Sequence, residues 1–279
     1  MAIDFPGHGL SSHLPAGSPY NDIIFVVELE RVIQKLGWKE RPFTILGHSM
    51  GAAIALFYAC LYPKAVQRIV ALDMIKPLTF QRENLAAKTR EGIEQFLQLE
   101  AKTMKAETLT NGATTNGCGN SSSAGIPTYD FDQAVVKLIQ AHSVFGAITR
   151  EGAEYLLKRG SKSLPGDPGK VYFTRDNRLK AMLFQRMDYE SLIHYFAQLD
   201  CELLIVKAEK GVKLDPDAVS DLYIELYNRQ CSRFEYAKVP GGHHVHLCQP
   251  DNVYPIVAKF ISGEQYQNGT STTTTATTS

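Results

Sequence analysis

A serine flanked by glycines is the clearest chemical feature of this 279-residue sequence. The segment Gly47-His48-Ser49-Met50-Gly51 has the spacing Gly-x-Ser-x-Gly, and it joins a β-rich run to an alanine-rich stretch. Between a strand and a helix, this spacing puts a serine hydroxyl on a sharp turn, where it can attack a carbonyl carbon. We therefore predict a nucleophile elbow with Ser49 as the nucleophile and the N–H of Met50 as a donor to the oxyanion. We expect Gly47 and Gly51 to be required because larger side chains would collide with the strand and the helix.

A serine needs a base to take its proton before it becomes a good nucleophile. The loop Gly242-His243-His244-Val245-His246 follows the last expected strand, which is where the base falls in the chain order serine, acid, histidine. We predict that His243 is the base, with His244 as the alternative. His48 is adjacent to Ser49, so its side chain should point away from the serine and should pack or form a hydrogen bond elsewhere.

The same histidine loop could instead hold a metal ion or form an ordinary polar turn. We find no Asp or Glu at a spacing that would complete a metal site. Hydrolysis through a serine needs no cofactor. We therefore predict neither a metal nor a cofactor.

A third group should orient the imidazole and stabilise its charged form. Asp73 ends an apolar run at the expected carboxyl edge of the sheet, where ligands bind in open α/β folds. Glu209 and Asp215 follow the next core strand. Each of the three could equally be a solvated loop carboxylate, so the residues alone leave the acid open.

Strands and helices alternate around these residues. Helices are predicted at 18–36, 52–62, 217–228 and 252–261, and β-rich runs occur at 43–46, 68–73, 203–206 and 234–239. Residues 2–5 have the character of the end of a further strand. The alternation predicts an α/β fold with a mostly parallel sheet and helices on both faces.

The long segment between the second and third of these strands is mostly helical and polar, which is typical of a cap inserted into a core. We predict core residues 1–76, a helical cap at 77–197 with one strand at 170–173, and core residues 198–263. Within the cap, residues 108–125 are rich in Thr, Asn, Gly and Ser, and we expect a mobile loop there. The Thr/Ser-rich tail 264–279 should be disordered.

The composition excludes several classes of protein. There are 29 basic and 29 acidic side chains, so neither sign attracts nucleic acid or an anionic membrane. The chain has no apolar run long enough to span a membrane and no signal peptide at its start. Its five cysteines are scattered. We expect an intracellular protein that acts on a small molecule. The cytoplasm is the expected location, and targeting to an organelle is the alternative. The sequence does not indicate an oligomeric state.

Three motifs in order resemble the α/β-hydrolase superfamily: Asp4-x-Pro6-Gly7-His8-Gly9-x-Ser11, then the serine elbow, then Gly242-His243-His244-x-His246-Leu247-x-x-Pro250. The histidine ending and Arg175-Asp176-x-Arg178-Leu179 are similar to serine hydrolase-like proteins, including the kraken type of insects. The resemblance covers roughly residues 1–262. It implies an α/β-hydrolase fold with a helical cap, and an esterase-like activity.

The resemblance also bears on the base and the acid. The family's base lies seven positions before the proline of the last helix, which is His243 here. In many relatives the acid follows the penultimate strand, but Gly211 stands at that position. Other relatives carry the acid after the strand that follows the nucleophile helix, and that position is Asp73. The resemblance therefore favours Asp73 over Glu209 and Asp215.

In the family, several strands and a His-Gly loop that supplies a second oxyanion donor come before the motif that starts at Asp4. Relative to that pattern, we expect a core that lacks its first strands. The strand at 43–46 would then have an unpaired edge or would pair improperly with residues 1–5. Losing one oxyanion donor costs about 10²- to 10³-fold in rate, so we expect low stability or weak activity.

Two functions fit these observations. The first is a carboxylesterase-like serine hydrolase that acts on a small ester or related carbonyl through a Ser-His-acid triad and an acyl-enzyme. The alternative is a catalytically impaired or inactive hydrolase-fold fragment, or a binding module. A dehalogenase is disfavoured because that chemistry in this fold uses an aspartate where Ser49 stands.

Overall fold

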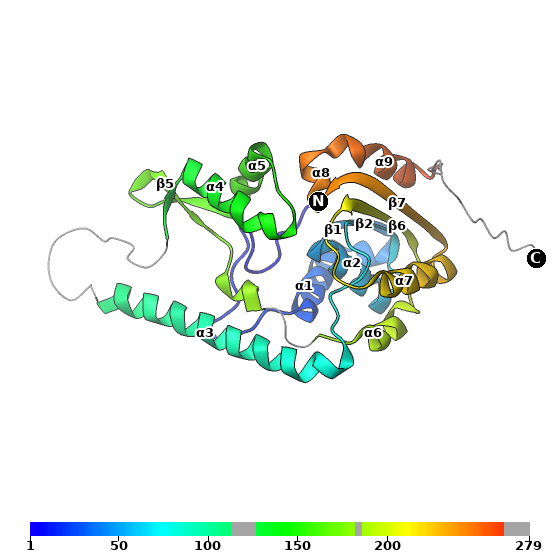
Figure 1. Ribbon diagram of the computed structural model, residues 1–279, viewed down its shortest axis with the longest axis horizontal. Helices are drawn as coiled ribbons and strands as arrows, with labels where there is room; N and C mark the ends of the chain where they lie inside the picture. Colours follow the sequence, from blue (N-terminus) through cyan, green and yellow to red (C-terminus); the bar gives the residue numbers. More distant parts are fainter. Residues whose placement is uncertain (113–126, 182–185, 265–279) are drawn as a thin grey trace, which may run out of the picture. The chain divides into compact units, whose positions relative to one another are not determined.

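A computed structural model describes residues 1–112, 127–181 and 186–264 (Figure 1). Its contacts divide the chain into two compact units. Residues 1–36 and 78–192 form what we call the helical unit, and residues 37–77 with the described residues from 193 onward form the sheet unit. The predicted cap, 77–197, remains a prediction. In the described ranges no helix combines the length and the apolar character that crossing a bilayer requires.

The sheet unit is built on four parallel strands in the order β1-β2-β6-β7. The strands are β1 (Phe43–His48), β2 (Val66–Leu72), β6 (Glu202–Lys210) and β7 (Arg233–Gly242). In register, Leu72 lies opposite His48 of β1 and Val206 of β6, so the carboxyl ends of three strands meet at one edge. The predicted parallel sheet is confirmed. Three of the four predicted core strands lie within observed ones, and the second, 68–73, extends one residue beyond the end of β2 at Leu72.

Helices cover both faces of this sheet. They are α2 (Met50–Leu61), α7 (Asp217–Gln230), α8 (Val245–Cys248) and α9 (Tyr254–Ser262), with short 3-10 turns at Trp38–Glu40 and Pro250–Asn252. Figure 1 shows α8 and α9 on one face and α2 and α7 on the other. Ile256 and Phe260 of α9 pack against Val70, Leu204 and Val239 in a buried core. Nine residues of α2 are buried, which is why its sequence is apolar on all sides.

β1 is the edge of the sheet: among the described residues it pairs only with β2. The exposed fraction of Leu46 in this strand is 53%. This agrees with the expectation of an unpaired edge. The alternative pairing with residues 1–5 does not occur, because those residues form no strand.

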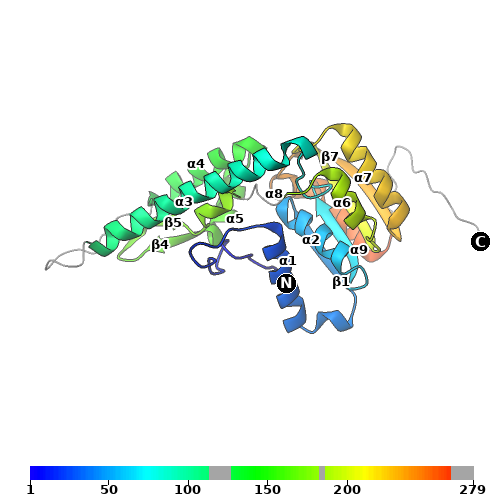
Figure 2. The ribbon, with the colours of Figure 1, turned by 90° about the horizontal axis from the view of Figure 1, so that it is seen from below.

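The helical unit contains α1 (Asp22–Lys35), α3 (Leu85–Gly112), α4 (Phe131–His142), α5 (Arg150–Gly160) and the first residues of α6 (Tyr189–Phe196), with 3-10 turns at Arg82–Asn84, Ser143–Phe145 and Asn177–Ala181. A small antiparallel sheet has the order β3-β5-β4, from β3 (Tyr129–Asp130), β4 (Ser161–Leu164) and β5 (Asp167–Phe173). Figure 2 shows α4 and α5 close to this sheet. Only β5 was predicted; β3 and β4 are short and polar, so they carry little strand signal.

Three local predictions are wrong. Residues 2–5 are not a strand, because Asp4 binds the N–H of Leu10 at 2.9 Å and closes a loop instead. α1 begins at Asp22, where Asn21 accepts the N–H of Ile24, and not at Ser18. Residues 108–112 are the end of α3 and not a loop. The rest of the predicted loop, 113–125, and the tail 265–279 lie outside the described residues.

A buried ion pair explains the Arg175-Asp176-x-Arg178-Leu179 motif. Arg178 contacts Asp176 at 2.8 Å and donates to the carbonyl oxygens of Leu14 at 2.6 Å and Pro15 at 2.7 Å. The hydroxyl of Tyr20 donates to the same carboxylate at 2.9 Å. The pair therefore fastens the loop before α1 to the chain after β5, within the helical unit.

We predict that Arg178→Ala lowers the free energy of unfolding by about 3–5 kcal/mol, because it leaves the buried Asp176 charge uncompensated. Arg31 is a matched control, since its ion pair with Glu28 is exposed. Urea titrations of the two variants measure the difference. An Arg178→Ala protein as stable as Arg31→Ala would contradict the structural role of the pair.

Candidate active site

The chain turns sharply at Ser49, between the end of β1 and the start of α2. Ser49 has φ 51° and ψ −117°, a backbone conformation that non-glycine residues rarely adopt. Its N–H donates to the carbonyl of Leu72 at 3.0 Å, and its own carbonyl accepts the N–H of Ala53 at 3.0 Å. Neighbouring structure therefore holds the strained turn from both sides, as a functional turn requires.

The two glycines of the elbow differ in what they do. A Cβ on Gly47 would lie 2.4 Å from the carbonyl carbon of Gly51, so no side chain fits at position 47. A Cβ on Gly51 itself would meet no atom of the described residues within 4 Å. The expectation that both glycines avoid a collision is therefore right for Gly47 and wrong for Gly51.

His243 links the serine to a carboxylate. Its Nε2 lies 2.9 Å from Ser49 Oγ, and its Nδ1 lies 2.6 Å from Asp73 Oδ2. An ionised carboxylate only accepts hydrogen bonds, so Nδ1 carries the proton and Nε2 presents a lone pair to the serine hydroxyl. This tautomer and orientation are those that general-base activation of a serine requires.

The carboxylate of Asp73 has no exposure to solvent and accepts four hydrogen bonds. Oδ1 accepts from the Lys207 ammonium and from the N–H of Ala208 at 3.0 Å, and Oδ2 accepts from His243 and from the N–H of Val212 at 3.0 Å. Burial by itself would raise the pKa of Asp73. The hydrogen bonds from His243, Lys207 and the Ala208 N–H, together with the charge of Lys207, outweigh burial, so the pKa of Asp73 is lowered.

Gly211 provides the space that this carboxylate occupies. A Cβ at Gly211 would lie 2.2 Å from Oδ1 and 2.3 Å from Oδ2 of Asp73. Position 211 is where the family resemblance expects an acid. In this chain, the carboxylate reaches the same space from β2 instead of from the turn after β6.

His48 binds the loop that carries His243. Its Nε2 lies 2.8 Å from the carbonyl oxygen of His243, and its ring centroid lies 4.0 Å from that of His246. Burial first, and then the neighbouring histidines, lower the pKa of His48 to about 3. His48 is therefore neutral near pH 7 and donates its Nε2–H to the carbonyl. The expected hydrogen-bonding role fits this geometry.

The other residues predicted for the site lie elsewhere. His244 is buried beside His48, with ring centroids 5.3 Å apart, and it is His243 that reaches Ser49. Asp215 pairs with Lys76 at 2.7 Å, and Glu209 is exposed. Met50 is the first residue of α2, so its N–H is one of four that have no acceptor within the helix. Sequence reasoning missed Lys207, whose only signal is a charge directly after the apolar run Leu203 to Val206.

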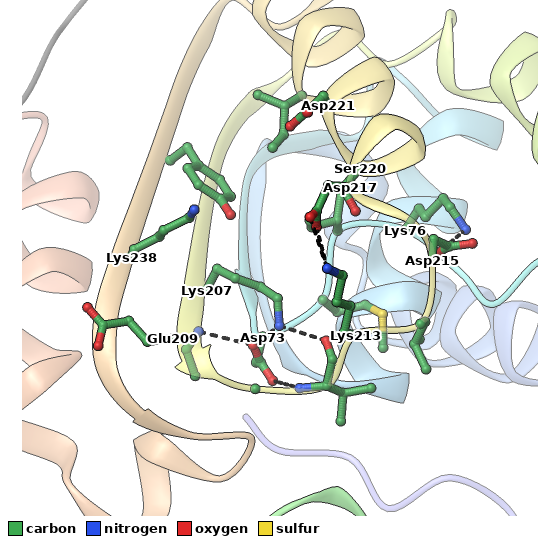
Figure 3. Close-up of a pocket in the computed structure, with 18 residues that line it drawn as sticks. Asp73, Lys76, Lys207, Glu209, Lys213, Asp215, Asp217, Ser220, Asp221 and Lys238 are labelled. Atoms are coloured by element: carbon green, nitrogen blue, oxygen red, sulfur yellow. Dashed lines mark hydrogen bonds and ion pairs between the residues drawn. The ribbon is translucent and has the colours of Figure 1, made fainter.

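A cavity of about 530 Å³ lies beside Asp73 (Figure 3). Residues of β6, β7 and α7 line it, and four lysines and five acids are among them. Ser49 and His243 are not among its described lining residues. Among the residues that the structure describes, no three His, Cys, Asp or Glu side chains gather to hold a metal ion.

Comparison with known proteins identifies the fold. Residues 1–250 match the α/β hydrolase fold family, so the chain belongs to that family, as the motifs indicated. Two similar relatives are the "Probable serine hydrolase" of Drosophila melanogaster, 29% identical over 264 residues, and human "Serine hydrolase-like protein 2", 28% identical over 274 residues. Each match covers 94% of this chain, with 72% of the fly protein and 77% of the human one. These names support a hydrolase.

Solved structures agree on the fold. A hypothetical protein from Pseudomonas aeruginosa aligns with a TM-score of 0.67 and 26% identity, over 93% of this chain and 79% of that one. The thioesterase domain from the curacin biosynthetic pathway aligns with a TM-score of 0.64 and 20% identity, over 91% and 79%. At that lower identity the likeness concerns the fold alone.

We predict that Gly211→Ala reduces hydrolytic activity about 100-fold, because the new methyl group collides with a carboxylate held by four donors. Gly160→Ala is the control, since a Cβ there meets no described atom within 4 Å. The measurement is the turnover of p-nitrophenyl acetate by each folded variant. Equal activities would show that the Asp73 carboxylate can move without consequence.

We predict that His48→Gln makes stability less sensitive to acid. The unfolded chain protonates this histidine below pH 6.5, whereas the folded chain keeps it neutral to about pH 3, so stability falls as the pH drops through that window. Gln keeps a donor for the His243 carbonyl and removes up to about 1.4 kcal/mol of this loss per pH unit. Urea titrations between pH 4 and 7, with the exposed His194→Gln as control, measure the slope. Identical slopes for both variants would contradict the prediction.

Proposed function

We propose that this protein is a carboxylesterase-like serine hydrolase that cleaves a small ester or related carbonyl compound through an acyl-enzyme. The observation that carries the proposal is the continuous hydrogen-bonded series Ser49–His243–Asp73, at 2.9 Å and 2.6 Å. The names of the fly and human relatives support the same reaction class.

In the first half-reaction, Ser49 Oγ attacks the carbonyl carbon while its proton passes to His243 Nε2. The imidazolium that forms is stabilised by the Asp73 carboxylate on its Nδ1 side. The N–H of Met50 donates to the oxyanion of the tetrahedral intermediate. When this intermediate collapses, the bond to the alcohol oxygen breaks, and the alcohol leaves with the proton from Nε2.

In the second half-reaction, His243 takes a proton from a water molecule, which attacks the acyl carbon. Collapse of the second intermediate releases a carboxylic acid and returns the proton to Ser49 Oγ. The tautomer of His243 suits both half-reactions. Nδ1 keeps its proton, which stays hydrogen-bonded to Asp73, and only Nε2 gains and loses a proton.

We predict that a fluorophosphonate probe labels the protein at Ser49 and that Ser49→Ala abolishes labelling. Asp73→Asn should slow turnover of p-nitrophenyl acetate by roughly 10⁴-fold, because it favours the wrong tautomer of His243. Ser143→Ala, which removes an exposed hydroxyl, is the control for the serine variant. Labelling by mass spectrometry and ester turnover are the measurements.

Absence of labelling in a protein that is folded by circular dichroism would count against the hydrolase. That outcome would favour the alternative, a binding module on a hydrolase fold. Labelling that survives in Ser49→Ala would place the reactive group elsewhere in the chain.

A further inference from the structure

A lysine of strand β6 contacts the carboxylate of Asp73. Lys207 follows four fully buried apolar residues, Leu203 to Val206, and the exposed fraction of its side chain is only 17%. Its ammonium contacts Asp73 Oδ1 and donates to the carbonyl oxygen of Val212 at 2.8 Å (Figure 3). One side chain thus links Asp73, the residue after β2, to the turn that follows β6.

A gain in stability does not by itself explain the buried ion pair between Lys207 and Asp73. Burying an ammonium and a carboxylate carries a large desolvation cost, and apolar replacements of buried ion pairs are often neutral or stabilising. The two oxygens of the Asp73 carboxylate also bind different hydrogen-bond donors. Lys207 binds Oδ1, which leaves Oδ2 directed at His243.

Resting on the proposed hydrolase function, we propose that Lys207 is a positioning residue of the active site, which fixes the orientation of the Asp73 carboxylate and keeps it ionised for His243. The lysine touches neither Ser49 nor His243 in any described contact, so it acts through Asp73. It also holds the 208–212 turn, whose N–H groups at Ala208 and Val212 bind the same carboxylate.

The ammonium also affects the pH range in which the base works. The hydrogen bond and the charge of Lys207 lower the pKa of Asp73, so without the ammonium the buried carboxylate would bind a proton at higher pH. A protonated Asp73 cannot stabilise the imidazolium that forms during the reaction, so the acid limb of the pH–rate profile should move toward higher pH.

Other charged groups lie near this pair and set its background. Lys76 is paired with Asp215 at 2.7 Å, and Lys213 is paired with Asp217 at 2.9 Å. Among the described residues, the other titratable groups that line the cavity or lie beside His243 and His48 are Glu209, Asp221, Tyr236, Lys238, His48, His244 and His246. Lys207 is the cation among them that contacts Asp73.

Lys238 is a matched control. It lies directly opposite Lys207 in the register of β6 and β7, and it lines the same cavity. Its side chain is exposed. A general effect of removing a lysine from this face of the sheet would therefore appear in both variants, whereas an effect through Asp73 would appear in one.

The test measures turnover of p-nitrophenyl acetate against pH. We expect Lys207→Met to lower kcat about 10- to 100-fold with little change in KM, and to move the acid limb of kcat/KM to higher pH. Lys238→Met should have the same kcat, the same KM and the same acid limb as the unchanged protein. Lys207→Arg keeps a cation and should keep the acid limb in place. Unchanged kcat and an unchanged pH profile in Lys207→Met would overturn the proposal.

A second measurement holds even if the methionine variant folds poorly. Lys207 lines the cavity, so Lys207→Ala should open a space that ethylammonium can enter from solvent. We expect ethylammonium to restore saturably the rate of fluorophosphonate labelling of Lys207→Ala, whereas tetramethylammonium, which cannot donate a hydrogen bond, should not. Failure of rescue in folded protein would overturn the positioning role.

These outcomes are separable from a failure of the proposed function. If the unchanged protein does not label at Ser49, the hydrolase proposal fails first. If it labels and Lys207→Met labels at the same rate across the pH range, only the role of Lys207 fails.

Discussion

The candidate site depends on one constraint: a carboxylate with no exposure to solvent must keep its charge. Transfer of an unpaired ion out of water is too costly for a folded protein, so the Asp73 oxygens need donors on every side. Two backbone N–H groups, an ammonium and an imidazole supply them. This requirement accounts for three features of the site: the turn after β6, the absence of a side chain at Gly211 and the tautomer of His243.

The parallel sheet brings these donors together. Backbone hydrogen bonds continue past the ends of β1 and β2: the Ser49 N–H donates to the Leu72 carbonyl, and the Asp73 N–H donates to the carbonyl of Val206 in β6 at 2.8 Å. The residues that follow β1 and β2 are therefore fixed relative to one another by main chain. The register of the sheet therefore determines where the side chains of Ser49 and Asp73 lie relative to each other.

The sequence predicted the core well because strand and helix periodicity and the glycine-serine elbow are local signals. It could not decide among Asp73, Glu209 and Asp215, since which carboxylate reaches His243 depends on how a turn after one strand meets the end of another. The glycine at 211 was visible, but it could not be interpreted without knowing that a carboxylate from β2 fills the space beside it. Lys207 could not be identified for the same reason: it is one of several charged residues of β6, and its role is not visible until its partner is located.

Positions 211 and 73 also exclude one another. The space at the strand ends holds one carboxylate, so a side chain at 211 and an aspartate at 73 cannot be accommodated together. A hydrolase of this fold with an acid at position 211 needs a residue at position 73 that leaves this space free. This is a packing rule that applies at a single point in the sheet unit.

Ser49 and Asp73 share one further property: among the described non-glycine residues, they alone have a positive φ. Strain of this kind costs roughly 1–3 kcal/mol per residue, and glycine would adopt the backbone of Ser49 without it. Selection of variants for heat resistance alone would therefore reward replacement of the proposed nucleophile. In this protein, a screen for thermostability needs a simultaneous screen for turnover, because relief of this strain would remove the residue on which the proposed activity depends.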